Sequence, residues 1–281
     1  MVMIDMRRWK NFRSARDTLK TCKTKTINGK DEALLLDASM NYGMVLDESL
    51  LDTLNKQTYR TYEKAATIQI NNLTSLEALF QLNERYSRVA VLDFASDSNP
   101  CGGFLNGYSA QEESLAYASN LYPALKQVKY QRFYKLHRSL TEKISPNKIA
   151  VSPDIVFFKN ERHEYLNKPI CAGVIVAAAV NQNSWRNKLS PSPYHVVYQQ
   201  MKLKIESILA VAALTEKDAL VLGAFGCGEY GNDPSMVAEI MKNALNDFRW
   251  KYAFKEVWIA IPDLNNRIVF EAMFSNKIIR K

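Results

Sequence analysis

The chain has 281 residues, of which 47% are hydrophobic and 23% charged, a balance that is typical of folded globular proteins and excludes a disordered chain. No apolar run approaches the ~20 residues that a bilayer-spanning helix needs, and the first residues lack the apolar stretch of a secretory signal. The formal net charge of +8 favours polyanionic partners, either nucleic acid or a phosphate-rich ligand, unless the basic surface only keeps the protein soluble.

Cysteine and histidine are too few and too scattered to indicate a metal site or a disulfide framework. They lie at Cys22, Cys101, Cys171 and Cys227, and at His137, His163 and His195. No two of the cysteines form a C-x-x-C pair. We therefore expect no metal, no cofactor, and a reducing, cytoplasmic location.

The chain is expected to begin with an amphipathic basic helix. Apolar residues recur at helical spacing at Met6, Trp9, Phe12, Ala15 and Leu19, and arginines and lysines occupy the other faces. Such a helix either packs on its own domain or serves as a targeting peptide or a nucleic-acid contact. The following region predicts a strand at 33–37, a short helix at 49–54 and a helix at 75–86.

From residue 89 onward, strands are expected to alternate with helices. The first predicted strand begins at residue 89, and further strands are predicted at 149–159, 172–180, 219–222 and 257–261. One predicted helix begins at residue 111, a second covers 122–140, and a long third helix ends near residue 214. A further helix is predicted at 234–248, and a short helix at the end of the chain. This alternation is typical of an α/β sheet with helices on both faces, in one domain with an N-terminal helical extension.

The other predicted elements are organised around the stretch Val89 to Ala118. It combines a buried strand, a loop of small residues, and a helix that opens on Gln111, Glu112 and Glu113. Small residues let backbone amides approach a ligand, and glutamates at the start of the helix would lie beside it. The alternative interpretation is that these acidic residues only decorate a helix start, where such residues are common.

A second glycine-rich loop, GAFGCGEYGNDP, follows another predicted strand. Its glycines at Gly226, Gly228 and Gly231 match the G-x-G-x-x-G pattern of dinucleotide folds. That pattern would place Pro234 inside the following helix, where a proline costs ~3 kcal/mol. Asp233 and Pro234 instead indicate an N-cap and a first helical residue. We expect an anion-binding loop, and a diphosphate between the two loops if their strands are neighbours.

The first loop and its helix, NPCGGFLNGYSAQEESL, resemble the signature of the bacterial-type poly(ADP-ribose) glycohydrolases, a branch of the macrodomain superfamily. That signature pairs three glycines with Gln-Glu-Glu several residues later. The resemblance continues through SPDIVFF, VIVAAAVN and VLGAFGCGEYGNDP, and covers most of the chain from about residue 25. It implies a three-layer α/β/α macrodomain-like fold with a mixed central sheet. It also implies a hydrolase that cleaves O-glycosidic ribose bonds of poly(ADP-ribose) or of ADP-ribosylated macromolecules.

The resemblance further implies roles for individual residues. Glu113 would be the catalytic acid and base, acting through an oxocarbenium-like transition state, and Glu112 beside it would hold ribose hydroxyls. Tyr230 takes the place of a phenylalanine that packs against the distal ribose. The implied substrate-binding residues are Asn99, Cys101, Gly102, Gly103, Asn106, Gln111, Asn181, Gly226, Cys227, Gly228, Glu229, Tyr230 and Gly231.

The chain departs from the family pattern in two places. Cys101 replaces the first of the three glycines, and Glu229 and Tyr230 replace Val-Phe before Gly231. A Cβ at position 101 could obstruct the ligand if the backbone there has a positive φ. Glu229 adds a negative charge beside a site for a diphosphate. The alternatives are therefore a non-hydrolytic ADP-ribose reader, or a hydrolase of a small ADP-ribose derivative.

The domain and partner expectations follow from these observations. Residues 1–24 should form the basic helix and residues 25–281 a single macrodomain-like domain. The expected partners are ADP-ribose, poly(ADP-ribose) and ADP-ribosylated macromolecules, with a weak nucleic-acid contact through the basic helix. We expect no membrane contact and a monomer.

Overall fold

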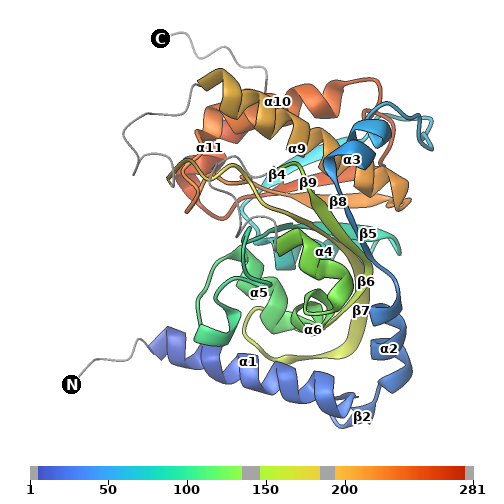
Figure 1. Cartoon of the computed structure of the whole chain (residues 1–281), viewed down its shortest axis with the longest axis vertical. Coiled ribbons are helices and arrows are strands. Elements are labelled where there is room, and N and C mark those ends of the chain that lie inside the picture. Colours follow the sequence, from blue (N-terminus) through green and yellow to red (C-terminus); the bar gives the residue numbers. More distant parts are fainter. Residues whose placement is uncertain (1–5, 135–145, 184–193, 276–281) are drawn as a thin grey trace.

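A seven-stranded mixed sheet forms the centre of the computed structural model, which describes residues 6–134, 146–183 and 194–275 (Figure 1). Its order is β3-β6-β7-β5-β8-β9-β4. The bounds are β3 Met44–Leu46, β4 Thr67–Asn71, β5 Val89–Phe94, β6 Ile149–Lys159, β7 Tyr165–Ala177, β8 Ala219–Leu222 and β9 Glu256–Ala260. The strands from β7 to β4 are parallel, and β6 is antiparallel to β3 and β7. A small separate ribbon pairs β1 Thr26–Ile27 with β2 Lys30–Asp31.

Helices cover both faces of the sheet, which gives the expected three layers (Figure 1). One face carries α3 Glu48–Leu54, α9 Tyr194–Leu214, α10 Pro234–Asn246 and α11 Leu264–Phe274. The other carries α4 Ser75–Asn83, α5 Gln111–Ala118 and α6 Leu121–Leu125, with the 3-10 turns η1 Phe104–Asn106 and η2 Val128–Tyr130. Helices α1 Met6–Thr24 and α2 Ala33–Asn41 lie beyond the second layer. No helix in the described ranges is both long and apolar enough to cross a lipid bilayer.

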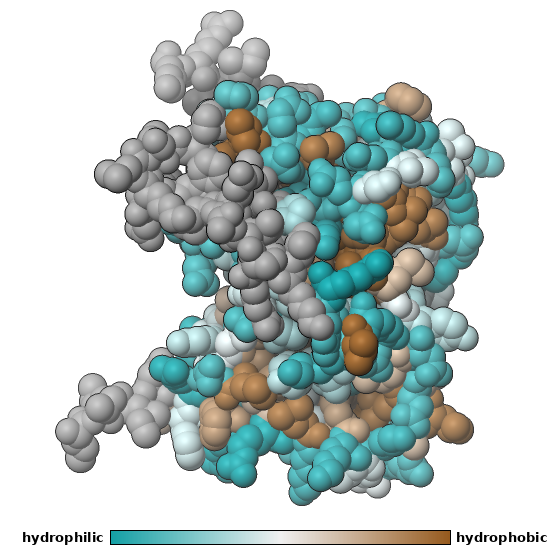
Figure 2. All heavy atoms as spheres, viewed as in Figure 1, coloured by the Kyte–Doolittle hydropathy of each residue, from teal (hydrophilic) through white to brown (hydrophobic). Residues whose placement is uncertain are grey.

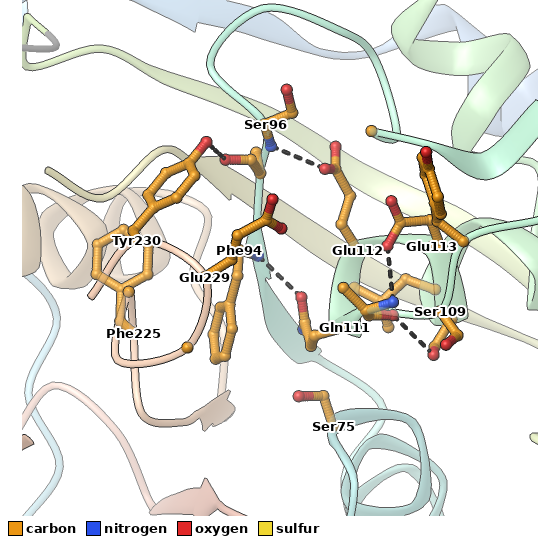
Figure 3. Close-up of a pocket in the computed structure, with 18 of the residues that line it drawn as sticks. Ser75, Phe94, Ser96, Ser109, Gln111, Glu112, Glu113, Phe225, Glu229 and Tyr230 are labelled. Carbon is orange, nitrogen blue, oxygen red and sulfur yellow. Dashed lines mark hydrogen bonds between the residues drawn. The ribbon is translucent and has the colours of Figure 1, made fainter. Parts of the chain in front are cut away.

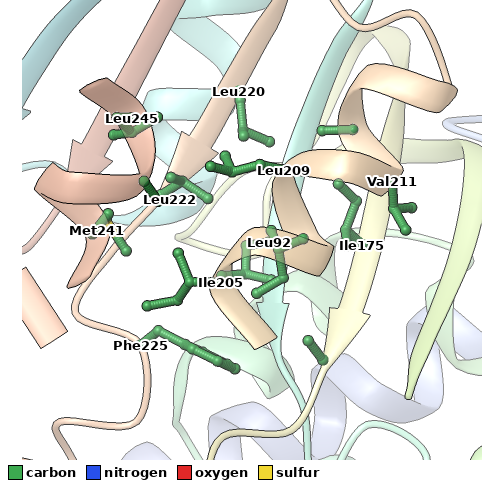
Figure 4. Packing of buried hydrophobic residues seen from close by; sticks show 14 of the residues in the cluster. Leu92, Ile175, Ile205, Leu209, Val211, Leu220, Leu222, Phe225, Met241 and Leu245 are labelled. Carbon is green, nitrogen blue, oxygen red and sulfur yellow. The ribbon is translucent and has the colours of Figure 1, made fainter. Parts of the chain in front are cut away.

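Alternation along β5 divides the core between the two layers. Ala90 and Leu92 pack with α9 and α10, in the cluster that Figure 4 shows around Leu209 and Leu222. Val91 packs on the opposite side, among the residues of α4 and α5. Because successive strand residues point to opposite faces, Asp93 belongs with Val91. A carboxylate is thus directed into the apolar layer beneath the first loop.

Helix α1 packs on the domain, as one of the sequence interpretations expected. The Thr18 hydroxyl donates to the Tyr117 carbonyl oxygen at 2.7 Å. The buried ammonium of Lys159 donates to the Thr18 hydroxyl at 2.9 Å and lies 2.7 Å from the Asp17 carboxylate. These contacts fix the helix against α5 and β6, while most of its arginines and lysines face outward.

The predicted strand at 33–37 is wrong, because these residues begin helix α2. The run Ala-Leu-Leu-Leu consists of strong helix formers, and its leucines do not alternate in burial. Leu36 is buried and Leu34 is 90% exposed, as expected on two faces of a helix. Of the predicted helix at 122–140, the structure has α6, η2 and a helical stretch at 131–134, and residues 135–140 lie outside the described ranges. Strands β3 and β4 were not predicted.

Candidate active site

The two glycine-rich loops lie side by side. Strands β5 and β8 are parallel neighbours, with Val91 opposite Val221, and both loops leave the carboxyl ends of these strands. Between the loops is a cleft of about 770 Å³, which is within the size range of small-molecule sites. The segments that follow β7 and β9 also line it, together with Arg7 of α1, the start of α4 and Glu161. The adjacency that the sequence analysis required for a shared anion site is therefore present.

Two backbone amides hold the carboxylate of Glu113 at the wall of the cleft. The Gly103 N–H donates to Oε1 at 2.7 Å, and the Ala110 N–H donates to Oε2 at 2.9 Å. The second bond is a capping interaction, because Glu113 is the third residue of α5 and reaches back to the residue before the helix. Glu113 is 6% exposed and lines the cleft. Its orientation is thus fixed by both the loop and the helix start.

Gln111 and Glu112 connect the same helix turn to the end of β5 (Figure 3). The Gln111 side chain accepts from the Phe94 N–H at 2.9 Å and donates to the Leu92 carbonyl oxygen at 2.7 Å. Glu112 Oε2 accepts from the Ser96 N–H at 2.7 Å. Both polar atoms of the Gln111 amide therefore hold α5 against β5. Gln111 thereby positions the two neighbouring glutamates at the wall of the cleft.

A buried acidic cluster lies beneath the first loop. Asp93 is fully buried, and neither of its carboxylate oxygens has a hydrogen-bond partner within the described ranges. Burial, followed by repulsion from Glu113, raises the pKa of Asp93 well above its usual range. Burial, followed by repulsion from Asp93, likewise raises the pKa of Glu112. The raised pKa values shift both groups toward the protonated form, which lowers the negative charge beside Glu113.

Asp93→Asn should stabilise the protein increasingly as pH rises. A carboxyl group whose pKa is raised in the folded state binds its proton more tightly in the folded than in the unfolded protein. The free energy of unfolding therefore falls as the pH rises from the unfolded-state pKa to the folded-state pKa. Removing the titrating group abolishes that loss, which amounts to at most about 1.4 kcal/mol per pH unit. Urea unfolding between pH 4 and pH 9 measures it, with the exposed Asp52→Asn as the control. Parallel stability curves for wild type and Asp93→Asn would contradict the account.

Cys101 adopts a left-handed backbone conformation, but its side chain does not enter the cleft. Its φ is 55°, a region that favours glycine. The side chain is 0% exposed and packs in the core with Phe104 and Tyr117. Burial and the neighbouring carboxylates raise the pKa of the Cys101 thiol, so the group is a buried thiol and not a nucleophilic thiolate. The obstruction considered for this position therefore does not arise from its Cβ.

Cys101→Gly should leave hydrolytic activity within about twofold of wild type. Glycine relieves a left-handed conformation that costs of order 1–3 kcal/mol, while the lost side chain leaves a small cavity of comparable cost. The free energy of unfolding should consequently change by less than about 1 kcal/mol. Denaturant unfolding and polymer hydrolysis assays measure the two effects. A large gain in activity on restoring glycine would show that Cys101 does obstruct the substrate.

The second loop contains glycines of two kinds. Gly226 and Gly231 have φ values of +75° and +68°, so the turn itself requires them. Gly228 has no such φ, and a Cβ built there would meet no atom within 4 Å. Neither the backbone conformation nor the packing therefore requires a glycine at position 228. The absence of a side chain there leaves that part of the cleft wall open. Asn232 shapes the loop from inside, since its amide donates to the Val180 and Gly226 carbonyl oxygens at 2.7 and 3.0 Å.

Tyr230 links the second loop to the first. Its hydroxyl oxygen accepts from the Asp97 N–H at 3.3 Å, and the hydroxyl lies 3.5 Å from the Ala95 carbonyl oxygen (Figure 3). Burial raises the pKa of this phenol, so it keeps its proton. A phenylalanine could not make this link between the walls of the cleft.

The structure gathers most of the expected site residues around the cleft. Those that line it are Asn99, Gly102, Gly103, Asn106, Gln111, Glu112, Glu113, Asn181, Gly226, Gly228, Glu229 and Tyr230. Cys101, Cys227 and Gly231 do not line it. Cys101 points into the core, Cys227 packs against the α9–α10 cluster, and Gly231 faces Asn183. The sequence did not predict the buried Asp93, the loop-shaping Asn232 or the cleft-lining Arg7 of α1 as site residues.

The mixed sheet, its two helical layers and a cleft across the ends of neighbouring parallel strands define a macrodomain-like α/β/α protein. The family model described as microbial-type PARG, catalytic domain, matches residues 15–160. The chain belongs to this family of poly(ADP-ribose) glycohydrolases, and the fold class and enzyme class that the sequence indicated are confirmed. No curated protein matches the chain.

Solved structures of bacterial enzymes share the fold over almost the whole chain. Poly(ADP-ribose) glycohydrolase from Thermomonospora curvata has a TM-score of 0.87 at 25% identity, covering 94% of this chain and 99% of that chain. The same enzyme bound to the inhibitor ADP-HPD has a TM-score of 0.83 at 25% identity, covering 92% and 97%. The enzyme from Deinococcus radiodurans in complex with ADP-ribose has a TM-score of 0.79 at 28% identity, covering 85% and 96%.

Proposed function

We propose that the cleft binds ADP-ribose, with the diphosphate between the two glycine-rich loops and the distal ribose against Glu113. The protein then hydrolyses O-glycosidic ribose bonds of poly(ADP-ribose) or of ADP-ribosylated macromolecules. The observation that carries this proposal is the placement of Glu113, whose carboxylate is held by two backbone N–H groups at the wall of a cleft that a second glycine-rich loop faces. The D. radiodurans relative in complex with ADP-ribose supports the ligand.

The reaction requires an acid and then a base at one place. Protonated Glu113 donates its proton to the leaving oxygen while the C–O bond breaks and positive charge develops on the ribose. The resulting carboxylate accepts a proton from the water that attacks the anomeric carbon, which restores the acid. Each carboxyl oxygen retains acceptor capacity after protonation, so both backbone N–H bonds can persist throughout.

The alternative function of a non-hydrolytic ADP-ribose reader now depends on Glu229 alone. The Cys101 side chain lies in the core and does not obstruct the cleft. Glu229 is exposed on the second loop and lines the cleft, so its charge would weaken diphosphate binding. This effect lowers affinity for substrate and product alike and does not remove the acid. Hydrolysis is accordingly the function that the arrangement supports best.

Two assays on the intact protein test the proposal. Release of ADP-ribose from labelled poly(ADP-ribose) measures turnover, and calorimetric titration with free ADP-ribose measures binding. Turnover together with binding is the expected result. Binding without turnover would favour the non-hydrolytic reader, and the absence of both would contradict the proposed ligand.

We further propose a domain boundary, an oligomeric state and a location for this protein. Residues 25–281 form the catalytic domain on which the helix within residues 1–24 packs, and the protein acts as a monomer. A cytoplasmic location is supported by the four unpaired cysteines. A weak contact between nucleic acid and α1 would show itself as salt-dependent binding that deletion of residues 1–22 removes.

A further inference from the structure

The first turns of α1 lie beside the cleft, with Arg7 in its lining. The Arg8 Nε donates to the Asn106 carbonyl oxygen at 3.0 Å, and the Arg8 guanidinium lies 4.9 Å from the centroid of the Tyr108 ring. The Asn11 amide donates to the Gly107 carbonyl oxygen at 3.3 Å. A Cβ added to Gly107 would come within 2.4 Å of the Arg8 carbonyl oxygen, so the helix and this turn are in close backbone contact. The helix is therefore fixed to the segment that leads directly into α5.

Arg7, on the first turn of α1, is the one cationic side chain among the described residues that line the cleft. The lining otherwise carries carboxyl groups, at Asp97, Glu112, Glu113, Glu161, Glu229 and Asp263. An acidic lining repels a substrate that carries two phosphate charges in every repeating unit. A guanidinium, by contrast, matches the geometry of phosphate oxygens. Arg7 is the lining side chain best suited to an anionic part of the substrate.

The position of α1 relative to Glu113 indicates which part of the substrate Arg7 meets. In Figure 3, Tyr230 and Phe225 lie on one side of Glu112 and Glu113, and Ser109 lies on the other. Ser109 follows the turn on which Arg8 and Asn11 pack, so α1 is on the side of Glu113 away from the second loop. If the second loop holds the diphosphate of the terminal ADP-ribose, the group that leaves from the anomeric carbon lies toward α1.

We propose that Arg7 belongs to a leaving-group subsite, where it binds the diphosphate of the next ADP-ribose unit in the polymer. This inference rests on the proposed function, because it assumes that the terminal unit occupies the cleft between the two loops. The subsite favours a polymer over a substrate whose leaving group carries no phosphate. Arg13 and Arg16 are exposed on the same helix and do not line the cleft, so their charges lack this role.

Arg7→Ala, compared with Arg16→Ala, tests the subsite at equal change in charge. For poly(ADP-ribose) hydrolysis, Arg7→Ala should lower kcat/KM about tenfold, the size expected for one charge-assisted hydrogen bond, and Arg16→Ala should stay within about twofold. The Kd for free ADP-ribose should be unchanged in both variants, since the product has no second unit. Arg7→Lys should recover part of the loss.

A binding measurement makes the test independent of turnover. The Kd of a short poly(ADP-ribose) oligomer is measured for Glu113→Gln alone and combined with Arg7→Ala, and the second substitution should weaken binding about tenfold. Equal losses for Arg7→Ala and Arg16→Ala, or competition by duplex DNA that depends on Arg7, would show a general polyanion surface and overturn the inference. A weaker Kd for free ADP-ribose in Arg7→Ala would do the same. A wild type without turnover would count against the proposed function, and the oligomer measurement would still decide the role of Arg7.

Discussion

Replacing Glu113 with glutamine is expected to lower kcat/KM for poly(ADP-ribose) hydrolysis by about a thousandfold. Glutamine has nearly the same shape but can neither protonate the leaving oxygen nor deprotonate water, and general acid–base catalysis contributes about 10²–10⁴-fold to a rate. The Kd for ADP-ribose should change by only a few fold, because the glutamine amide oxygen can keep one of the two backbone N–H bonds and the second loop is untouched. Steady-state hydrolysis and calorimetric titration measure the two quantities.

Glu112→Gln is the matched control for this substitution. Glu112 is the adjacent residue and is equally buried, but burial and Asp93 raise its pKa, so glutamine replaces a carboxyl group whose charged form is already disfavoured. The amide oxygen can still accept from the Ser96 N–H. We expect less than a tenfold loss of activity. If the losses in the two variants were equal, the acid would have been assigned to the wrong residue or would be shared by the pair.

Gly102→Ala is expected to lower activity by about a hundredfold and to destabilise the fold by about 1–3 kcal/mol. A Cβ there would lie 2.5 Å from Glu113 Oε1 and 3.0 Å from Glu112 Oε2, and the φ of +51° is itself unfavourable for alanine. The Glu113 carboxylate cannot move away without losing its bonds from Gly103 and Ala110. Enzyme kinetics measure the effect of the displaced acid, and urea unfolding measures the strain.

Gly228→Ala separates a ligand contact from a requirement of the fold. Nothing in the described protein lies within 4 Å of a Cβ at this position, so stability should be unchanged within about 0.5 kcal/mol. ADP-ribose binding should nevertheless weaken if the backbone of the second loop approaches the diphosphate. Unaltered binding by Gly228→Ala, or unaltered activity of Gly102→Ala, would contradict the placement of the ligand between the loops.

The features that could be predicted from the sequence are those with a local signal. The Gln-Glu-Glu helix start follows directly from the order of residues, and Asp233 caps α10 as expected, with its side chain accepting from the Ser235 N–H at 2.9 Å. The proline at the first helical position also correctly separated the second loop from the dinucleotide pattern. Each of these signals lies within a few residues of the structure that it specifies.

The features that could not be predicted depend on contacts that are distant in sequence. Arg7 lies about 100 residues before the helix of Glu113, and only packing brings it to the cleft. The consequence of Cys101 depended on its φ and on the direction of its side chain, which a sequence does not encode locally. Asp93 did carry a signal, as the one charged residue in the apolar strand VAVLDF, and its burial explains why that charge matters.

The most direct test of the central claim is a crystal structure of the protein with ADP-ribose. The account predicts that the diphosphate lies along the backbone amides between Gly226 and Tyr230. It also predicts that a Glu113 carboxyl oxygen lies within hydrogen-bond distance, about 3 Å, of the oxygen on the anomeric carbon of the distal ribose. A ligand bound outside the cleft, or bound with its adenine at Glu113 and the distal ribose at the far end, would contradict the account.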